Sequence, residues 1–125
     1  KVWPGSVTVV FKHKAKLPLV LTGGKDTIGI RIPDHPFVRA LLARLDFPLA
    51  QTSANISDDP ASKTPAEAAA YFENIEDKPD IIIDGGSLPS TSSTVIDFTS
   101  DHPIMLRAGP ITKSELDALL QPRED

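Results

Sequence analysis

The run Ser6-Val7-Thr8-Val9-Val10-Phe11 is rich in β-branched residues and predicts a β-strand near the start of the chain. The run Thr27-Ile28-Gly29-Ile30-Arg31-Ile32 alternates apolar and polar residues, which predicts a second strand. Its three isoleucines should face a core, and Thr27, Gly29 and Arg31 should face the opposite side. Further strands are predicted over Leu17–Leu21, Phe47–Thr52, Asp80–Asp84, Ser93–Phe98 and Ile104–Arg107.

Three helices are expected between and after these strands. The first has Asp34 as its N-cap and a buried stripe formed by Val38, Leu41, Leu42 and Leu45. A capping box at Thr64–Glu67 opens the second, which should run through Phe72, and Thr112–Glu115 opens the third. Because several strands follow one another without a helix between them, the pattern favours a mixed sheet covered by helices over a purely parallel one.

The composition indicates one domain of 125 residues with a net charge of -4. An acidic balance argues against broad non-specific nucleic-acid binding, and the lack of cysteine excludes disulfides and thiolate metal sites. No apolar run approaches the ~20 residues of a membrane helix, so no membrane association and a cytoplasmic location are the expectation. The chain begins at Lys1-Val2-Trp3-Pro4 without a methionine, which predicts that it starts inside a larger domain.

Several common catalytic and metal-binding motifs are missing from the sequence. His13, His35 and His102 lack the spacing of metal ligands, so no metal site is predicted. There is no nucleophile elbow, and Gly23-Gly24-Lys25 lacks the rest of a phosphate-binding P-loop. Asp84-Gly85-Gly86 is expected to end a strand in a turn that needs positive φ.

Two hydroxyl-rich segments remain, Thr52–Asn55 and Ser92–Thr94, each at the expected end of a strand. Small polar residues at such positions form a poor core but a good ligand edge. Together with other polar residues at strand edges they make a candidate set: Thr8, Thr27, Arg31, Ser53, Asn55, Ser92, Ser93, Thr94 and Arg107. Two arginines among hydroxyls suit a phosphate and a carboxylate, because guanidinium binds both anions through paired hydrogen bonds.

Six segments, in order, resemble the YrdC-like family of threonylcarbamoyl-AMP synthases. Pro4–Thr8 resembles the family's Pro-Gly-Pro-x-Thr segment, and Ile28–Pro36 resembles its Val-Gly-Ile-Arg-Ile-Pro-Asp-His stretch. Pro48–Ser57 resembles its Thr-Ser-Ala-Asn-x-Ser motif. Later blocks match at Ile83–Gly86, Ser92–Asp97 and Leu106–Gly109.

The resemblance implies an α+β fold of three layers, with a twisted mixed β-sheet flanked by helices around a positively lined cavity. It implies that ATP, L-threonine and bicarbonate yield threonylcarbamoyl-AMP and pyrophosphate, with Mg²⁺ accompanying ATP. The product would pass to a tRNA-modifying transferase machinery that forms threonylcarbamoyladenosine at position 37. Ser53, Asn55, Ser93 and Arg107 carry over as ATP or adenylate contacts, and Thr8, Thr27 and Arg31 line the threonine and phosphate cavity.

Two departures from the family pattern stand out. The chain lacks the upstream Pro-Thr-Asp/Glu-Thr segment and Lys-x-Arg motif, and it has Ser6 where proline is usual. Two alternatives stay open: a carbamoyltransferase-type domain of hydrogenase maturation, and a non-catalytic module that binds tRNA weakly. The only support for the second is the basic segment Lys12–Lys16.

Overall fold

The computed structural model describes residues 2–14, 16–55, 59–89 and 91–120. The chain divides into two compact units, one formed by Lys1–Ala50 with Thr91–Asp125 and the other by Gln51–Ser90. In the part of the chain that the structure describes, the first unit holds the β-sheet and three helices, and the second holds one helix.

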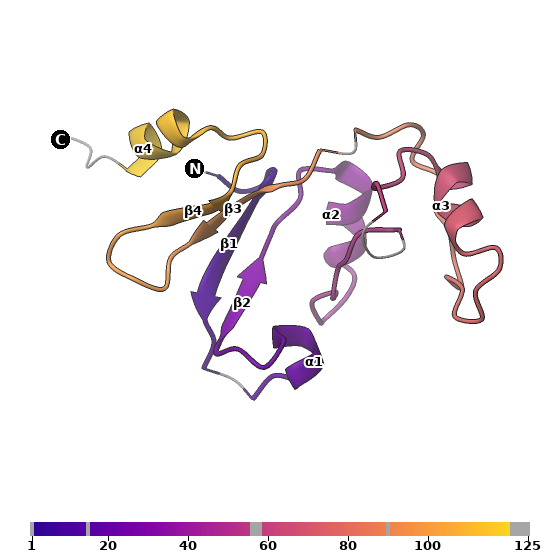
Figure 1. Ribbon diagram of the computed structural model, residues 1–125, viewed down its shortest axis with the longest axis horizontal. Helices are drawn as coiled ribbons and strands as arrows, with labels where there is room; N and C mark the ends of the chain where they lie inside the picture. The colour runs from indigo at the N-terminus through magenta and orange to yellow at the C-terminus, as the bar shows by residue number, and fades with distance from the viewer. Residues whose placement is uncertain (1, 15, 56–58, 90, 121–125) are drawn as a thin grey trace. The chain divides into compact units, whose positions relative to one another are not determined.

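The first unit is built on a four-stranded sheet with the order β2-β1-β3-β4 (Figure 1). The strands are β1 (Val7–Lys12), β2 (Thr27–Ile30), β3 (Thr94–Asp97) and β4 (Ile104–Arg107). β1 runs antiparallel to β2 and parallel to β3, and β3 runs antiparallel to β4. The sheet is therefore mixed and the fold class is α+β, as the sequence predicted.

The helices are α1 (Leu19–Thr22), α2 (Pro36–Leu42), α3 (Pro65–Tyr71) and α4 (Lys113–Leu120). The predicted strand at Leu17–Leu21 is wrong, because this segment forms the single turn α1. Pro18 precedes the turn, where a fixed φ favours helix entry. Gly23 ends it in the left-handed region at φ 60°, and its N–H donates to the carbonyl of Leu19.

Two more predicted strands, Phe47–Thr52 and Asp80–Asp84, are wrong. Both segments are irregular, and neither pairs with a strand among residues 2–14, 16–55, 59–89 and 91–120. The isoleucines of the second segment are exposed rather than buried, with Ile81 at 78%. A strand persists only where a neighbour satisfies its backbone. Pro48 also removes a backbone donor from the first segment.

The core lies on one face of the sheet and follows the alternation of β1. Val7 and Val9 are buried there with Ile96 of β3 and Leu116 of α4. Partly buried apolar side chains surround this cluster: Val2, Trp3, Phe11, Met105 and Ile111. The helix α4 therefore covers the centre of this face through Leu116.

The alternating segment that contains β2 takes the predicted sides, but its isoleucines are not buried. Ile28 pairs with Phe11 and Ile30 pairs with Val9, so both lie on the core side. Ile30 is nevertheless 43% exposed and Ile32 is 44% exposed, which contradicts the predicted burial. β2 is an edge strand, and the side chain that closes the core, Leu116, packs over the central strands β1 and β3.

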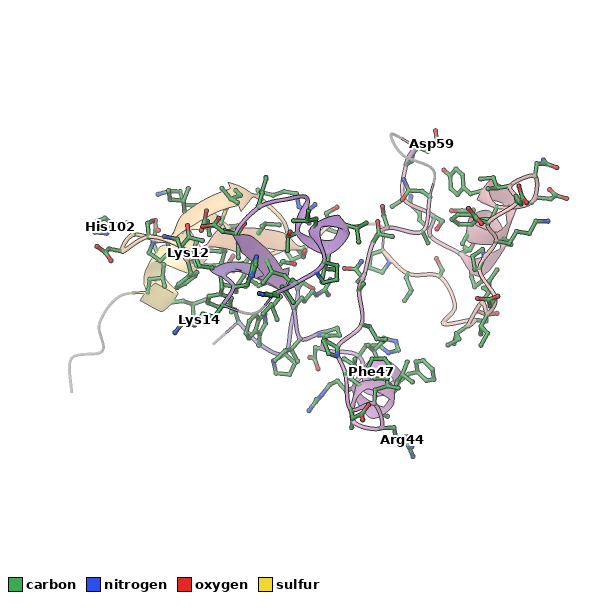
Figure 2. The ribbon with its side chains drawn as sticks, turned by 90° about the horizontal axis from the view of Figure 1, so that it is seen from below. Lys12, Lys14, Arg44, Phe47, Asp59 and His102 are labelled. Carbon is green, nitrogen blue, oxygen red and sulfur yellow. The ribbon has the colours of Figure 1, made fainter. Side chains whose placement is uncertain are left out.

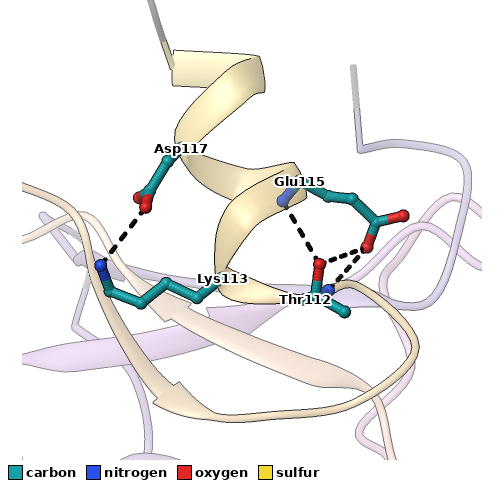
Figure 3. Close-up of polar contacts among 4 residues, drawn as sticks. All are labelled: Thr112, Lys113, Glu115 and Asp117. Carbon is teal, nitrogen blue, oxygen red and sulfur yellow. Dashed lines mark hydrogen bonds and ion pairs between the residues drawn. The ribbon is translucent and has the colours of Figure 1, made fainter.

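The capping box of α4 forms as predicted (Figure 3). Thr112 Oγ1 accepts from the N–H of Glu115 at 3.3 Å, and Glu115 Oε2 accepts from the N–H of Thr112 at 2.8 Å. The hydroxyl of Thr112 also donates to Glu115 Oε2 at 2.7 Å. Leu116 belongs to the core cluster and Ile111 packs against it, so the cap fixes α4 where its apolar side chains meet the sheet.

The other two helix starts differ from each other. At α3, Thr64 Oγ1 accepts from the N–H of Glu67 as predicted, whereas the Glu67 carboxylate accepts from the N–H of Lys63. At α2 the predicted N-cap Asp34 is wrong, because His35 occupies that position. Asp34 instead lies 3.9 Å from the guanidinium of Arg39.

The predicted apolar stripe of α2 is present, but it is only half-buried. Val38, Leu41 and Leu42 lie in α2, whereas Leu45 lies beyond the end of the helix. No residue of α2 is buried. The prediction of a fully buried stripe is therefore wrong.

We expect Ile96→Ala to destabilise the protein by about 2–5 kcal/mol, because a fully buried side chain is replaced by a cavity. Ile104→Ala on the adjacent strand is the matched control, since Ile104 is 56% exposed and should change the free energy of unfolding by less than about 1 kcal/mol. Urea denaturation measures both variants. Equal losses would show that the core does not lie on the predicted side of β3.

Acidification should weaken the α4 cap. Hydrogen bonds from Thr112, first its N–H and then its hydroxyl, hold the pKa of Glu115 below its ordinary value. Because the pKa of Glu115 is lowered in the folded protein, its carboxylate contributes its full stabilisation at pH values above its unfolded pKa of about 4.3. This stabilisation is lost as the pH falls through the pKa of the folded protein. The difference in thermal midpoint between the wild type and Glu115→Gln should therefore be largest near neutral pH and shrink below about pH 4. A difference independent of pH would contradict the role of the carboxylate.

Candidate functional site

The face of the sheet opposite the core carries most of the predicted binding residues of the first unit. Thr8 points away from the core because it alternates with Val7 and Val9, and the register places Gly29 and Arg107 on the same side. We call this the polar face. Alternation and the register assign to it Thr8, Thr27, Gly29, Arg31, Ser93, Asp97 and Arg107, with the apolar side chains of Val10, Val95 and Ile104 among them.

Three predicted residues from different parts of the chain meet on the polar face. The hydroxyls of Thr8 and Ser93 are 2.9 Å apart and hydrogen-bonded. Arg107 Nη2 donates to Ser93 Oγ at 3.1 Å, and Arg107 Nε donates to the Ser93 carbonyl at 3.0 Å. The structure thus places Thr8, Ser93 and Arg107 in one hydrogen-bonded cluster, in which Ser93 is the central member.

The cluster presents charge and hydrogen-bond donors outward. Ser93 is 7% exposed, whereas Arg107 is an exposed residue. A guanidinium has five N–H donors, and the two contacts to Ser93 use two of them. The remaining donors belong to a group whose orientation is already fixed. Such a fork suits a phosphate or a carboxylate.

Arg31 lies on the same face and holds the segment that leads into β1. Its Nε donates to the carbonyl of Gly5 at 2.9 Å, and the N–H of Gly5 donates to the carbonyl of Ile32 at 2.8 Å. A Cβ at Gly5 would approach the carbonyl oxygen of Val2 to 2.7 Å. The terminal nitrogens of Arg31 therefore provide a second cationic position beside the start of β1.

Gly109 allows the chain after β4 to pack closely against the chain at the start of β3, a role that the sequence did not predict. A Cβ at this position would overlap the backbone nitrogen of Thr94 and lie 2.6 Å from the carbonyl oxygen of Ser92. The same approach lets Thr94 Oγ1 donate to the carbonyl of Ile111 and accept from its N–H, both at 3.0 Å. The signal available in the sequence was a glycine two residues after a strand that ends in Arg107.

Thr27 lies on the polar face but at its other end. It begins β2 opposite Lys12, and with Gly29 it lines an open cavity of about 640 Å³. Asp97 also lines this cavity. Hydrogen bonds from Thr99, side chain first and then backbone, lower the pKa of Asp97 from its ordinary value, so this carboxylate is charged at neutral pH.

Ser53 and Asn55 belong to the second unit, in an irregular segment rather than at a strand end. Asn55 Nδ2 donates to the carbonyl of Asp59 at 2.8 Å, and Ser62 Oγ donates to the carbonyl of Ala54 at 2.9 Å. The amide of Asn55 therefore makes a local contact within the second unit. Ser53 is exposed. Ser57, part of the same predicted motif, lies outside the described residues.

The basic segment after β1 is accessible. Lys12, Lys14 and Lys16 are exposed, and Figure 2 shows Lys12 and Lys14 at the end of β1. His13 Nε2 lies 3.2 Å from the carbonyl oxygen of Lys25.

In residues 2–14, 16–55, 59–89 and 91–120 no three His, Asp or Glu side chains group to hold a metal ion. No helix in those ranges has the length and apolar character needed to cross a membrane.

A family model described as "Telomere recombination", for the Sua5, YciO and YrdC proteins, matches residues 1–109. The chain belongs to this Sua5/YciO/YrdC family. The resemblance inferred from the sequence motifs is thereby confirmed.

Within the family, the chain is similar to two proteins named threonylcarbamoyl-AMP synthase. It is 37% identical over 119 residues to the one from Pyrococcus abyssi and 39% identical over 123 residues to the one from Bacillus subtilis. These alignments cover 94% and 96% of the chain but 34% of each relative. The chain therefore spans about a third of the length of these family members.

Solved structures of the family support the fold. A crystal structure of P. abyssi Sua5 complexed with L-threonine superposes with a TM-score of 0.85 at 36% identity, covering 94% of this chain and 34% of that one. A crystal structure of Escherichia coli YciO superposes with a TM-score of 0.71 at 34% identity, covering 86% of this chain and 52% of that one. Both contain the same arrangement of strands and helices over most of this sequence.

We expect Gly109→Ala to destabilise the first unit by about 1–3 kcal/mol, because the added methyl meets backbone atoms of Ser92 and Thr94 that cannot move aside. Gly85→Ala is the matched control, since the nearest atom to a Cβ there is Leu88 Cδ1 at an ordinary 3.8 Å. Thermal unfolding by circular dichroism compares the two. A Gly109→Ala protein as stable as the Gly85→Ala protein would refute the close approach.

Proposed function

We propose that this chain forms part of an L-threonylcarbamoyladenylate synthase, which makes threonylcarbamoyl-AMP and pyrophosphate from ATP, L-threonine and bicarbonate. The observation that carries the proposal is the cluster of Thr8, Ser93 and Arg107 on the polar face. The names of the P. abyssi and B. subtilis relatives support the activity, and the complex of P. abyssi Sua5 with L-threonine supports the amino-acid substrate.

In this proposal Arg107 and Ser93 bind the phosphate region of ATP and of the adenylate. The guanidinium is held by two hydrogen bonds to Ser93, so little side-chain freedom remains to be lost when an anion binds. Arg31 lies on the same face and would bind a second anionic group, such as the carboxylate of threonine. The family resemblance further assigns Thr8 and Thr27 to the threonine and phosphate cavity, and Ser53 and Asn55 to the nucleotide.

The chemistry needs alignment more than a protein nucleophile. The amine of threonine adds to the carbon of CO₂ derived from bicarbonate, and loss of a proton gives a carbamate. A carbamate oxygen then attacks the α-phosphorus of ATP, the bond to the β-phosphate oxygen breaks, and pyrophosphate leaves with that electron pair. Fixed cations that face the phosphate oxygens lower the barrier to such a step.

Magnesium would enter with ATP, coordinated by the phosphate oxygens. The product would be passed to a transferase that modifies tRNA. The exposed Lys12, Lys14 and Lys16 favour weak tRNA contact as a second candidate function.

The decisive experiment incubates the whole protein with ATP, L-threonine and bicarbonate and follows threonylcarbamoyl-AMP by mass spectrometry. Wild-type protein should form it only with all three substrates. Arg107→Ala should bind ATP about 10- to 100-fold more weakly, the loss expected for about 1.5–3 kcal/mol from a charge-assisted hydrogen bond. Arg44→Ala is the control, because Arg44 is exposed and its guanidinium donates to the carbonyl of Ala40 in α2.

Other outcomes separate the alternatives. ATP affinity unchanged by Arg107→Ala, measured by calorimetry, would reject the assignment of this residue. Adenylate formation from carbamoyl phosphate instead of threonine and bicarbonate would favour the carbamoyltransferase alternative. Salt-dependent tRNA binding without ATP turnover would favour the RNA-binding module.

A further inference from the structure

The contact between Thr8 and Ser93 joins two hydroxyls, and its direction decides what the cluster offers to a ligand. Their oxygens are 2.9 Å apart, and either one could be the donor. Ser93 Oγ also accepts from Arg107 Nη2 at 3.1 Å. A hydroxyl has one proton and two lone pairs. If Thr8 donates, both lone pairs of Ser93 are used and its proton is left to donate elsewhere.

Burial limits where the Ser93 proton can go. Ser93 is 7% exposed, so almost all of its surroundings are protein. Its oxygen already contacts Thr8 on one side and the guanidinium on the other. Two accepted hydrogen bonds also polarise the remaining O–H and strengthen it as a donor. One direction of the oxygen is left for an acceptor bound on the polar face.

Thr8 is itself held in the orientation that this arrangement needs. A Cβ on Gly29 of the neighbouring strand would lie 3.1 Å from the methyl carbon Cγ2 of Thr8, so this methyl sits directly over Gly29. β-Branched residues have few χ1 rotamers. With its methyl over Gly29, the hydroxyl of Thr8 reaches Ser93. The contacts then run from Gly29 in β2 through Thr8 in β1 and Ser93, which directly precedes β3, to Arg107 in β4.

We propose that Thr8 is a positioning residue that acts through Ser93: its hydroxyl donates to Ser93 Oγ, which directs the Ser93 proton and the Arg107 guanidinium at one anionic oxygen of the ligand. The inference rests on the proposed nucleotide site and makes it more specific. It replaces the expectation that Thr8 contacts the ligand directly. Gly29 supports the same arrangement by leaving room for the methyl of Thr8.

The test is a set of threonine variants in the whole protein, with ATP as the probe in calorimetry. Thr8→Val keeps the shape but removes the hydroxyl, and we expect ATP affinity to fall about five- to tenfold. Thr8→Ser keeps the hydroxyl and should restore most of the affinity. Ser100→Ala removes an exposed hydroxyl in the β3–β4 connection and should leave ATP affinity at the wild-type level.

A double-mutant cycle with Ser93→Ala distinguishes an indirect role from direct contact. If Thr8 acts through Ser93, Thr8→Val should change ATP affinity less than about twofold in the Ser93→Ala background. A loss of the same size in both backgrounds would overturn the proposal, because Thr8 would then touch the nucleotide itself. Unchanged affinity in Thr8→Val alone would overturn it as well.

A ligand-free measurement separates this inference from the proposed function. The Arg107 Nη2–H resonance in ¹⁵N NMR reports the hydrogen bond to Ser93 Oγ, and Thr8→Val should shift it while Thr8→Ser and Ser100→Ala leave it in place. If wild-type protein does not bind ATP, the nucleotide assignment fails, but the resonance still decides whether Thr8 positions the cluster. An Arg107 signal insensitive to Thr8→Val would overturn the positioning role.

Discussion

The alternation of side chains along β1 is the constraint on which the rest of the structure depends. Val7 and Val9 point to one side and form the core with Ile96 and Leu116. Thr8, between them, must therefore point to the other side, where it meets Ser93. Since β1 pairs with both β2 and β3, it also sets the sides of their residues. A shift of one residue in β1 would bury Thr8 and expose the valines, so core and site are specified by the same register.

Glycine supplies the second constraint, at two places where chains approach closely. Gly29 admits the methyl of Thr8 between β1 and β2, and Gly109 admits the backbone of Ser92 and Thr94 beside the end of β4. Both contacts act on the same cluster from opposite edges of the sheet. The hydrogen bonds of Arg107 to Ser93 follow from this close packing, and they orient a charged group that is otherwise exposed. Fixed geometry of this kind is what binding an anion at low entropic cost requires.

The sequence predicted those elements whose signals are local. β-Branched alternation located β1 and β2, and the Thr112–Glu115 capping box located the start of α4. It failed at Phe47–Thr52 and Asp80–Asp84, where apolar runs look like strands but no partner strand pairs with them among the described residues. It also failed at Leu17–Leu21, because Pro18 and Gly23 favour a helical turn over an extended chain.

The polar set was predictable as a list, and Thr8, Ser93 and Arg107 do meet. That Thr8 bonds to Ser93, and that Gly109 makes the meeting possible, depends on contacts between residues distant in the chain, which no local pattern encodes.

The central claim is that the polar face, and not the core face, binds the anionic part of a nucleotide. The most direct measurement is a crystal structure of the whole protein with a non-hydrolysable ATP analogue. The account predicts a phosphate oxygen within hydrogen-bond distance of both Arg107 and Ser93 Oγ, with Val7, Val9 and Ile96 still buried on the opposite side of the sheet. Phosphates bound elsewhere, with Arg107 and Ser93 turned away from them, would contradict it.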